Sequence, residues 1–221
     1  MNAKRLASNR ARCARYRQKH RQKRLLANRK CKLACKLEVL SHYSSGLAQC
    51  CLCDEARLGA LHVDHINNDG RDHRRDRVHS LYYWLKKHNF PPGFRILCSN
   101  CNWKEYLRHS AKIFVENSKA TRQRAYTANI RATLMAKLGN KCSTCGIADI
   151  DMLTVHHKNH DGASHRKAVG ANGGVAFYRV ILNDSKFDWS TVECLCFSCN
   201  DNDEYVGYRG DLERTMKCVS P

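Results

Sequence analysis

The sequence lacks a long apolar run. No stretch of about 18 consecutive apolar residues occurs in the 221 residues, so no transmembrane helix is indicated. No short apolar core follows the N-terminal charges, so no secretory signal is indicated and we expect a protein that is not secreted. We therefore expect the 14 cysteines to be reduced, in the cytoplasm of a host cell, a nucleus or an organelle, where metal binding is favoured over disulfide bonds.

Acidic residues are absent from two long segments. Glu38 is the first acid of the chain, and none lies between Glu116 and Asp149. Over the whole chain, 39 Lys and Arg face 20 Asp and Glu, a formal net charge of +19. This excess suits a polyanionic partner, which we expect to be nucleic acid, with double-stranded DNA first, rather than a membrane. An organellar transit peptide remains an alternative for the acid-free start.

Both acid-poor segments also lack proline and are rich in Ala, Leu, Lys, Arg and Gln, which favours helix. We predict a basic helical nucleic-acid-binding arm over residues 1–37 and a basic helical linker over residues 111–129. Gly46 and Gly139 are expected to end these helical patterns. Apolar residues three or four positions apart predict one buried stripe near the end of each pattern: Leu33, Leu37 and Leu40, then Ile130, Leu134 and Leu138.

The chain contains one internal repeat. Each copy has a CxxC pair, a polar pair after a valine, a His-Arg pair, and a second CxxC followed by Asn. Cys53 to Asp64 and Cys145 to His156 both span 11 residues (64 − 53 and 156 − 145). The second copy is longer further on, and the extra residues fit a Gly-rich loop over residues 170–174. Chance does not readily supply the same ordered set twice, so we predict two units, over residues 38–110 and 130–221.

Each unit is small and has few aromatic residues, so it is expected to need a metal or disulfide staple. Two CxxC pairs supply four thiolates, the ligand number of tetrahedral zinc. Disulfides or unrelated free thiols remain the alternative. Cys51 and Cys194 have no counterpart in the other copy and are excluded. We predict two structural zinc ions, one held by Cys50, Cys53, Cys98 and Cys101, the other by Cys142, Cys145, Cys196 and Cys199.

Residues beside the cysteines suit phosphodiester hydrolysis, which needs an attacking water, a base and a cation at the leaving oxygen. Asp64 and the amide carbonyl of Asn102 are oxygen ligands of the kind that Mg²⁺ prefers. Neutral His65 suits the general base because its ordinary pKa lies near working pH. In an extended strand Asp64 and His65 would face opposite ways, whereas a bent loop would let them share one site. An ordinary turn pair, with Asn102 as a helix N-cap, is the alternative.

The second copy offers His156, His157 and Asn200 at the equivalent places. His156 would ligate through nitrogen, which suits softer transition metals better than Mg²⁺. We therefore expect the first copy, which keeps a carboxylate, to be the stronger centre.

Other repeated features allow two interpretations. His73-Arg74 and His165-Arg166 recur at equal spacing, and such a cation either holds the scissile phosphate or is a solvated surface pair. The polar stretch over residues 67–70 and its counterpart over residues 159–162 are predicted to be turns. The aromatic residues over 82–84 and 177–178 are expected on one internal helix per copy, packed into the core.

Together these motifs resemble the zinc-containing HNH (His-Asn-His, ββα-metal) endonucleases, especially phage HNH proteins and the recombination endonuclease VII group. The resemblance rests on Cys50-x-x-Cys53, Val63-Asp64-His65 and Leu97-Cys98-x-x-Cys101-Asn102, and it covers residues 38–108 and, more weakly, 130–208. It implies an α+β fold of two tandem treble-clef ββα-metal units, a catalytic Mg²⁺ or Mn²⁺, and cleavage that leaves a 3′-hydroxyl. It also implies His65 as general base, with Asp64 and Asn102 holding the ion.

The expected function is therefore a metal-dependent DNA endonuclease, of the homing or phage recombination type. Two copies in one chain mimic a homodimer, so we expect a monomer that acts as a pseudo-dimer. The alternative is a non-catalytic double zinc knuckle that binds DNA or RNA inside a larger assembly. Charge and cysteines fit both interpretations, whereas Asp64-His65 with Asn102 favours the enzyme, because binding alone does not require them.

Overall fold

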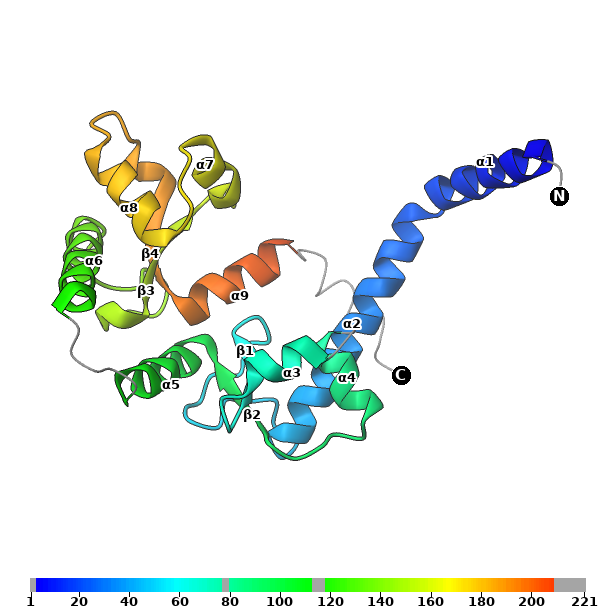
Figure 1. The fold of residues 1–221 in the computed structure, drawn as a ribbon, viewed down its shortest axis with the longest axis horizontal. Helices are drawn as coiled ribbons and strands as arrows, with labels where there is room; N and C mark the ends of the chain where they lie inside the picture. The colour runs from blue at the N-terminus through cyan, green and yellow to red at the C-terminus, as the bar shows by residue number, and fades with distance from the viewer. Residues whose placement is uncertain (1–2, 77–79, 113–117, 209–221) are drawn as a thin grey trace.

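Each copy of the repeat forms a small two-stranded antiparallel sheet, which we call a hairpin although helices lie between its two strands. The computed structural model describes residues 3–76, 80–112 and 118–208 (Figure 1). The start of the predicted arm, part of the predicted linker and the end of the predicted second unit therefore lie outside the described residues. Strand β1 (Leu61–His65) pairs with β2 (Phe94–Cys98), and β3 (Leu153–His157) pairs with β4 (Val192–Cys196). Leu61 faces Cys98 in one hairpin as Leu153 faces Cys196 in the other. The chain is thus a mixed α+β protein with two hairpins in the same register.

Helices surround both hairpins. The first unit uses α3 (Gly70–Asp76), α4 (Leu81–Lys87) and α5 (Ser99–Lys112). The second uses α6 (Ser118–Lys137), α7 (Gly162–Ala168), α8 (Gly174–Asn183) and α9 (Phe197–Tyr208), with short 3-10 turns at Ile150–Met152 and Trp189–Thr191. The single internal helix expected per copy was wrong, because each described unit has two short helices between its strands. None of the helices in these ranges combines the length and apolarity that a membrane crossing requires.

The predicted turns are present and lead directly into helices. Asn68 and His160 both have left-handed backbone, with φ of 58° and 54°. Their amides donate to the carbonyl oxygens of His65 and His157, each at 2.9 Å. Gly70 then begins α3, and Gly162 begins α7.

The basic N-terminal segment is helical and leads into the first unit. Helices α1 (Ala3–Lys19) and α2 (Arg21–Tyr43) follow one another, and α1 projects away from both units (Figure 1). Helix α2 runs through residue 37 without a break, and its second half packs on the first unit. Leu33 and Leu40 are buried there, at 5% and 0% exposure. The Lys36 amine donates to the Leu58 carbonyl at 2.5 Å. The first unit therefore includes the end of the arm helix.

Each unit has its own apolar core. The first gathers Leu40, Leu61, Ile96 and Leu97, and the second gathers Leu134, Met135, Leu153, Phe177, Ile181 and Leu195. The expected core role of the aromatic residues is confirmed for Phe177 and Tyr178, which are buried. It was wrong for Tyr83, which is 52% exposed. Helix α4 buries Leu85 instead, because a short surface helix turns one face to the core.

The two units meet through equivalent positions on α5 and α9, which lie side by side (Figure 1). The Asn100 amide donates to Ser198 Oγ at 3.2 Å, and the Ser198 amide donates to Asn100 Oδ1 at 3.1 Å. These two residues follow the third zinc-motif cysteine by two positions in both copies. Each therefore contacts its own counterpart, as in an isologous dimer contact.

Neighbouring pairs follow the same approximate two-fold relation. Ser99 Oγ donates to Asp201 Oδ2 at 2.5 Å, and the equivalent pair, Phe197 and Trp103, has ring centroids 5.5 Å apart. Burial acts to raise the pKa of Asp201, but hydrogen bonds from His62 and Ser99 outweigh it and lower that pKa. The contact between the units thus has a polar pair, Ser99 and Asp201, on one side of the approximate two-fold axis that relates the units, and an aromatic pair, Phe197 and Trp103, on the other side.

Candidate metal centres and the adjoining cleft

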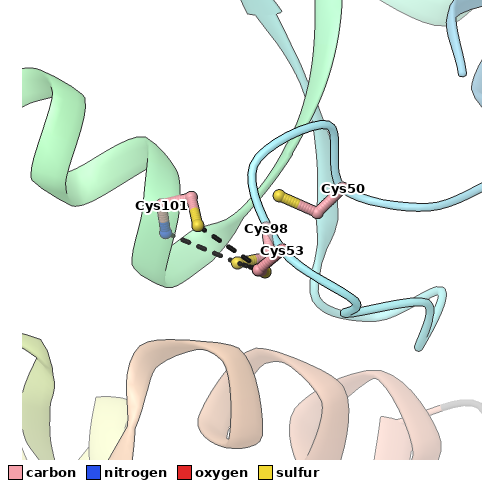
Figure 2. Close-up of side chains that lie close together, drawn as sticks. All are labelled: Cys50, Cys53, Cys98 and Cys101. Carbon is pink, nitrogen blue, oxygen red and sulfur yellow. Dashed lines mark hydrogen bonds between the residues drawn. The ribbon is translucent and has the colours of Figure 1, made fainter.

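The first cysteine quartet is assembled by a loop, a strand end and a helix start. Cys50 and Cys53 come from the loop before β1, Cys98 ends β2, and Cys101 lies in the first turn of α5 (Figure 2). Their sulfur atoms turn toward one another, with Cys53 Sγ 3.7 Å from Cys98 Sγ and 3.6 Å from Cys101 Sγ. Zinc–sulfur bonds of about 2.3 Å in a tetrahedron place sulfurs about 3.8 Å apart. The quartet therefore has the dimensions of a zinc site.

The second quartet repeats this geometry with Cys142, Cys145, Cys196 and Cys199. Cys145 Sγ lies 3.7 Å from Cys196 Sγ. The amides of Cys101 and Cys199 each donate to the sulfur three residues earlier, at 3.4 Å. All eight thiols are free, and the measured separations far exceed the roughly 2.05 Å of a disulfide bond. The chain thus has two four-cysteine clusters that could hold zinc, and the disulfide alternative is not what the structure contains.

Thiol acidity also suits a bound cation. Burial, and then the electrostatic interaction with the neighbouring Cys98, raise the pKa of Cys101 well above its ordinary value. Burial raises the pKa of Cys53 to about 11. At Cys142 burial acts in the same direction, but backbone hydrogen bonds outweigh it and lower the pKa to about 7. The four sulfurs of one cluster do not ionise together readily, and a divalent cation would remove that repulsion.

In the first unit, the expected ion ligand Asp64 contacts an arginine. Arg95 lies directly opposite Asp64 on β2 and donates from Nε to Asp64 Oδ2 at 2.8 Å. Its Nη2 donates to Glu105 Oε2 at 3.0 Å. Burial acts to lower the pKa of Arg95, but the two carboxylates outweigh it and raise that pKa. Asn102 lies one residue past Cys101 on α5. The carboxylate expected to meet a divalent cation thus already meets a guanidinium.

The second unit brings the expected ligands His156 and Asn200 together. His156 Nδ1 lies 2.9 Å from Asn200 Oδ1, and its Nε2 lies 3.1 Å from Asp203 Oδ2. His160 Nε2 lies 3.6 Å from the same carboxylate oxygen. The residue opposite His156 is Glu193, whose carboxylate accepts from the Ser143 hydroxyl at 2.5 Å. The cross-strand position thus carries an acid here and an arginine in the first unit.

His160 and Asp203 were not predicted, although the sequence carried signals for both. An acid follows the motif asparagine by three positions in each copy, as Glu105 after Asn102 and Asp203 after Asn200. His160 follows His156 by four positions, in the turn where the first copy has Asn68.

Each expected general base pairs with a second histidine. His65 Nε2 lies 2.8 Å from His73 Nδ1, and His157 Nε2 lies 3.0 Å from His165 Nδ1. His73 and His165 therefore contact the expected base, whereas Arg74 and Arg166, the cations of these pairs, are exposed. His73 Nε2 is buried and has no hydrogen-bond partner among the described residues. Burial lowers the pKa of His157 below its ordinary value, which favours the neutral imidazole.

The members of each expected metal-and-base pair point in opposite directions. Asp64 and His65 are adjacent in β1, and His156 and His157 are adjacent in β3, so alternate side chains face opposite sides. The bent-loop alternative is therefore not what the structure has.

A Cβ atom added to Gly162 would lie 2.8 Å from His157 Nδ1, so glycine allows the start of α7 to approach this nitrogen.

A cleft of 1220 Å³ adjoins the second unit. Its lining includes His156, His157 and Asn200 from the second unit, so both faces of β3 border one cavity. Lys32 and Lys36 of α2 line it too. Basic side chains of the arm and the imidazoles of the second unit therefore share one space.

Comparison with known proteins identifies no relative. No protein-family model, curated protein or solved structure matches this chain. The likeness to HNH endonucleases rests on the sequence motifs alone, and membership of that family stays a prediction.

Proposed function

We propose that this protein is a metal-dependent HNH endonuclease that hydrolyses phosphodiester bonds in DNA, built as two tandem treble-clef ββα-metal units with two structural zinc ions. One observation carries the proposal. His156 and Asn200 are 44 residues apart in sequence and 2.9 Å apart in the structure, and the adjacent His157 pairs with His165 at 3.0 Å. A zinc scaffold that only binds nucleic acid requires neither contact.

His157 is the proposed general base. When its Nε2–H donates to His165 Nδ1, the lone pair of His157 lies on Nδ1, the nitrogen next to Gly162. This nitrogen takes the proton of the attacking water, and His165 fixes the tautomer that makes it available. A divalent ion held by neighbouring residues would supply stabilisation of the charge that develops at the leaving oxygen.

The basic arm is the proposed grip on DNA. Helix α1 exposes Arg5, Arg10, Arg12, Arg15, Arg17 and Lys19. Contacts from such side chains to phosphates position a duplex without reading its sequence. The arm continues into α2, which lines the cleft beside His157. DNA held along the arm would thus be led toward the second unit.

A plasmid-nicking assay with Mg²⁺, Mn²⁺ or Co²⁺ tests the proposal. Wild-type protein should nick, and His157→Ala should lose about 10²–10⁴-fold in rate, the usual contribution of general-base catalysis. His65→Ala is the matched control, because it removes the equivalent imidazole from the first unit. Zinc content should stay the same in both variants. Wild-type protein that binds DNA but does not nick it with any of these ions would leave the binding module as the function.

A further inference from the structure

We propose that the second unit binds one divalent transition-metal ion through His156, His160 and Asp203, and that Asn200 orients His156 instead of ligating the ion. The inference names the ion centre of the proposed nuclease, and its catalytic meaning rests on that function. The binding itself can be measured without cleavage.

The three donor atoms already lie close together. One ring nitrogen of His156, one ring nitrogen of His160 and one carboxylate oxygen of Asp203 all lie within 4.8 Å of one another. His156 is buried at 5% exposure, whereas His160 and Asp203 are accessible, at 42% and 48%. Two imidazoles and one carboxylate are a common ligand set for catalytic zinc and for non-haem iron, and both leave positions open for water or substrate. Mg²⁺ prefers a set made of oxygen atoms, so this site favours transition metals.

Asn200 determines which nitrogen of His156 is available. The amide oxygen of Asn200 is only an acceptor, so the His156 Nδ1 next to it must carry the proton. Neutral His156 then has its lone pair on Nε2, the nitrogen that faces Asp203. Metal-binding histidines usually donate their other N–H to such a partner, which fixes the ring and raises its basicity.

The turn after β3 supplies His160 without a change of backbone. Asn68 occupies the equivalent position in the first unit, with φ of 58° against 54° for His160 and with the same 2.9 Å turn hydrogen bond. The second unit thus adds an imidazole on an unaltered turn. His160→Asn would install the first unit's residue, so the variant is expected to fold.

In the first unit, the guanidinium of Arg95 occupies the position equivalent to the proposed ion site. Asp64 and Glu105 are the counterparts of His156 and Asp203, and the guanidinium of Arg95 contacts both carboxylates. A positive charge is therefore already built in where the ion would bind. The second unit has Glu193 at that position, so its ligands meet no such competitor there. We accordingly expect one ion per chain in addition to the two zinc ions.

The site is open to exchange from the cleft. His156, His160 and Asn200 all line it, and so does Arg166 on α7. An ion at this place would face the same cavity as His157, with the open coordination positions accessible to a phosphate or a water.

Cobalt titration of the zinc-loaded full chain tests the proposal. Calorimetry should show one Co²⁺ bound per chain, and visible absorption should show nitrogen and oxygen ligands without thiolate-to-cobalt charge transfer. Asn200→Ala should weaken binding about 10–100-fold, the usual effect of removing a residue that orients a ligand, and Asp203→Asn and His160→Asn should weaken it more. Asp184→Asn, at an exposed carboxylate after α8, is the matched control and should bind as wild type. Arg95→Gln should take up one further Co²⁺.

The outcomes separate this site from the proposed function. Absence of a third ion, or unchanged affinity in Asp203→Asn and His160→Asn, would overturn the site. Failure of Arg95→Gln to gain an ion would show that Arg95 is not what closes the first unit. Co²⁺ binding as expected without DNA cleavage would keep the site and refute the nuclease. Wild-type rates of cleavage by Asp203→Asn and His160→Asn, with their Co²⁺ binding lost, would keep the nuclease and the ion site and refute the catalytic role of this ion.

Discussion

The two units carry different charges at the place where an ion would bind, because the first unit has Asp64 and Arg95 where the second has His156 and Glu193. The carboxylate of Asp64 favours a hard cation, and that preference alone ranks the first unit above the second. An ion needs that oxygen accessible, however, and Arg95 holds it in an ion pair whose members are only 24% and 19% exposed. Removing a partner from such a pair leaves the other charge poorly solvated. The contacts therefore favour the second unit as the stronger centre, the reverse of the order that ligand chemistry alone predicts.

Gly162→Ala tests whether His157 Nδ1 is the working nitrogen. The added Cβ would lie 2.8 Å from this atom, so the imidazole must shift. A misplacement near 1 Å costs about 10²-fold in rate, and we expect a loss of that size in plasmid nicking. Zinc content should not fall, whereas Tm should fall somewhat, because displacing the buried His157 ring is an overpacking that costs about 1–3 kcal/mol.

Gly70→Ala is the matched variant in the first unit, where the Cβ would lie 3.1 Å from His65 Nδ1. It should leave nicking near the wild-type rate. Equal, unreduced rates in both variants would show that neither Nδ1 takes the proton.

Sequence analysis predicts the site residues that belong to motifs with a regular spacing along the chain. The cysteine quartets and the meeting of His156 with Asn200 follow from motifs in which short spacings recur. The contact of Arg95 with Asp64 depends on which residues face each other across β1 and β2. That register is set after a connection of 28 residues between the strands (positions 66–93), which no motif spans. Three-dimensional contacts of this kind cannot be derived from one chain's spacing.

At the scale of helices, the arm has a free part and a packed part. Removing residues 1–37 would also remove Leu33, which is buried in the first unit. A deletion of residues 1–20 instead removes α1 and leaves α2 complete. DNA affinity should fall, and the log–log salt slope should flatten by roughly 0.9 for each phosphate that the shortened protein no longer binds. Fluorescence anisotropy over a salt series measures both. An unchanged slope, with two zinc ions retained, would show that α1 does not touch the DNA backbone.

The cysteine quartets connect elements that are otherwise held by short hairpins. Cys98→Ser should reduce zinc from two ions to one per chain and unfold the first unit, because zinc contributes on the order of 10–16 kcal/mol in small knuckles. That is about as large as the roughly 5–15 kcal/mol by which most domains are stable. Elemental analysis and amide NMR spectra measure the two effects. Cys51→Ser, an exposed thiol outside the quartet, should change neither. Two zinc ions in folded Cys98→Ser would contradict the assignment.

Of the helices between the paired strands, the sequence predicted α4 and α8 but not α3 and α7. Aromatic residues over 82–84 and 177–178 indicated one internal helix per unit, and these residues lie on α4 and α8. Helices α3 and α7 are polar and only seven residues long, so they carry no apolar stripe to recognise. The predicted Gly-rich loop lies between α7 and α8, where Gly170 has a φ of 67°.

At the scale of the whole molecule, the two units are joined as a pseudo-symmetric pair. Asn100 and Ser198 contact each other reciprocally and are both buried. Arg57 of the first unit also lies 3.4 Å from Cys199 Sγ of the second. Contacts between equivalent positions are what a duplicated dimer would retain. The pair thus has the symmetry to meet two strands of a duplex, while its two candidate centres differ in chemistry.

This asymmetry predicts a nickase. If the second unit alone holds an ion, one encounter with supercoiled plasmid cuts one strand, and nicked circles should accumulate before linear DNA appears. His65→Ala should then leave the ratio of nicked to linear product unchanged, since the first unit would contribute DNA binding and not catalysis. His157→Ala should lower both products together by about 10²–10⁴-fold. Gel separation of the plasmid forms at limiting protein, with a duplex labelled on each strand in parallel, measures these ratios. Linear DNA formed at the same rate as nicked circles, and lost in His65→Ala, would instead mean that both units cut and that the ion pair of Arg95 opens when DNA binds.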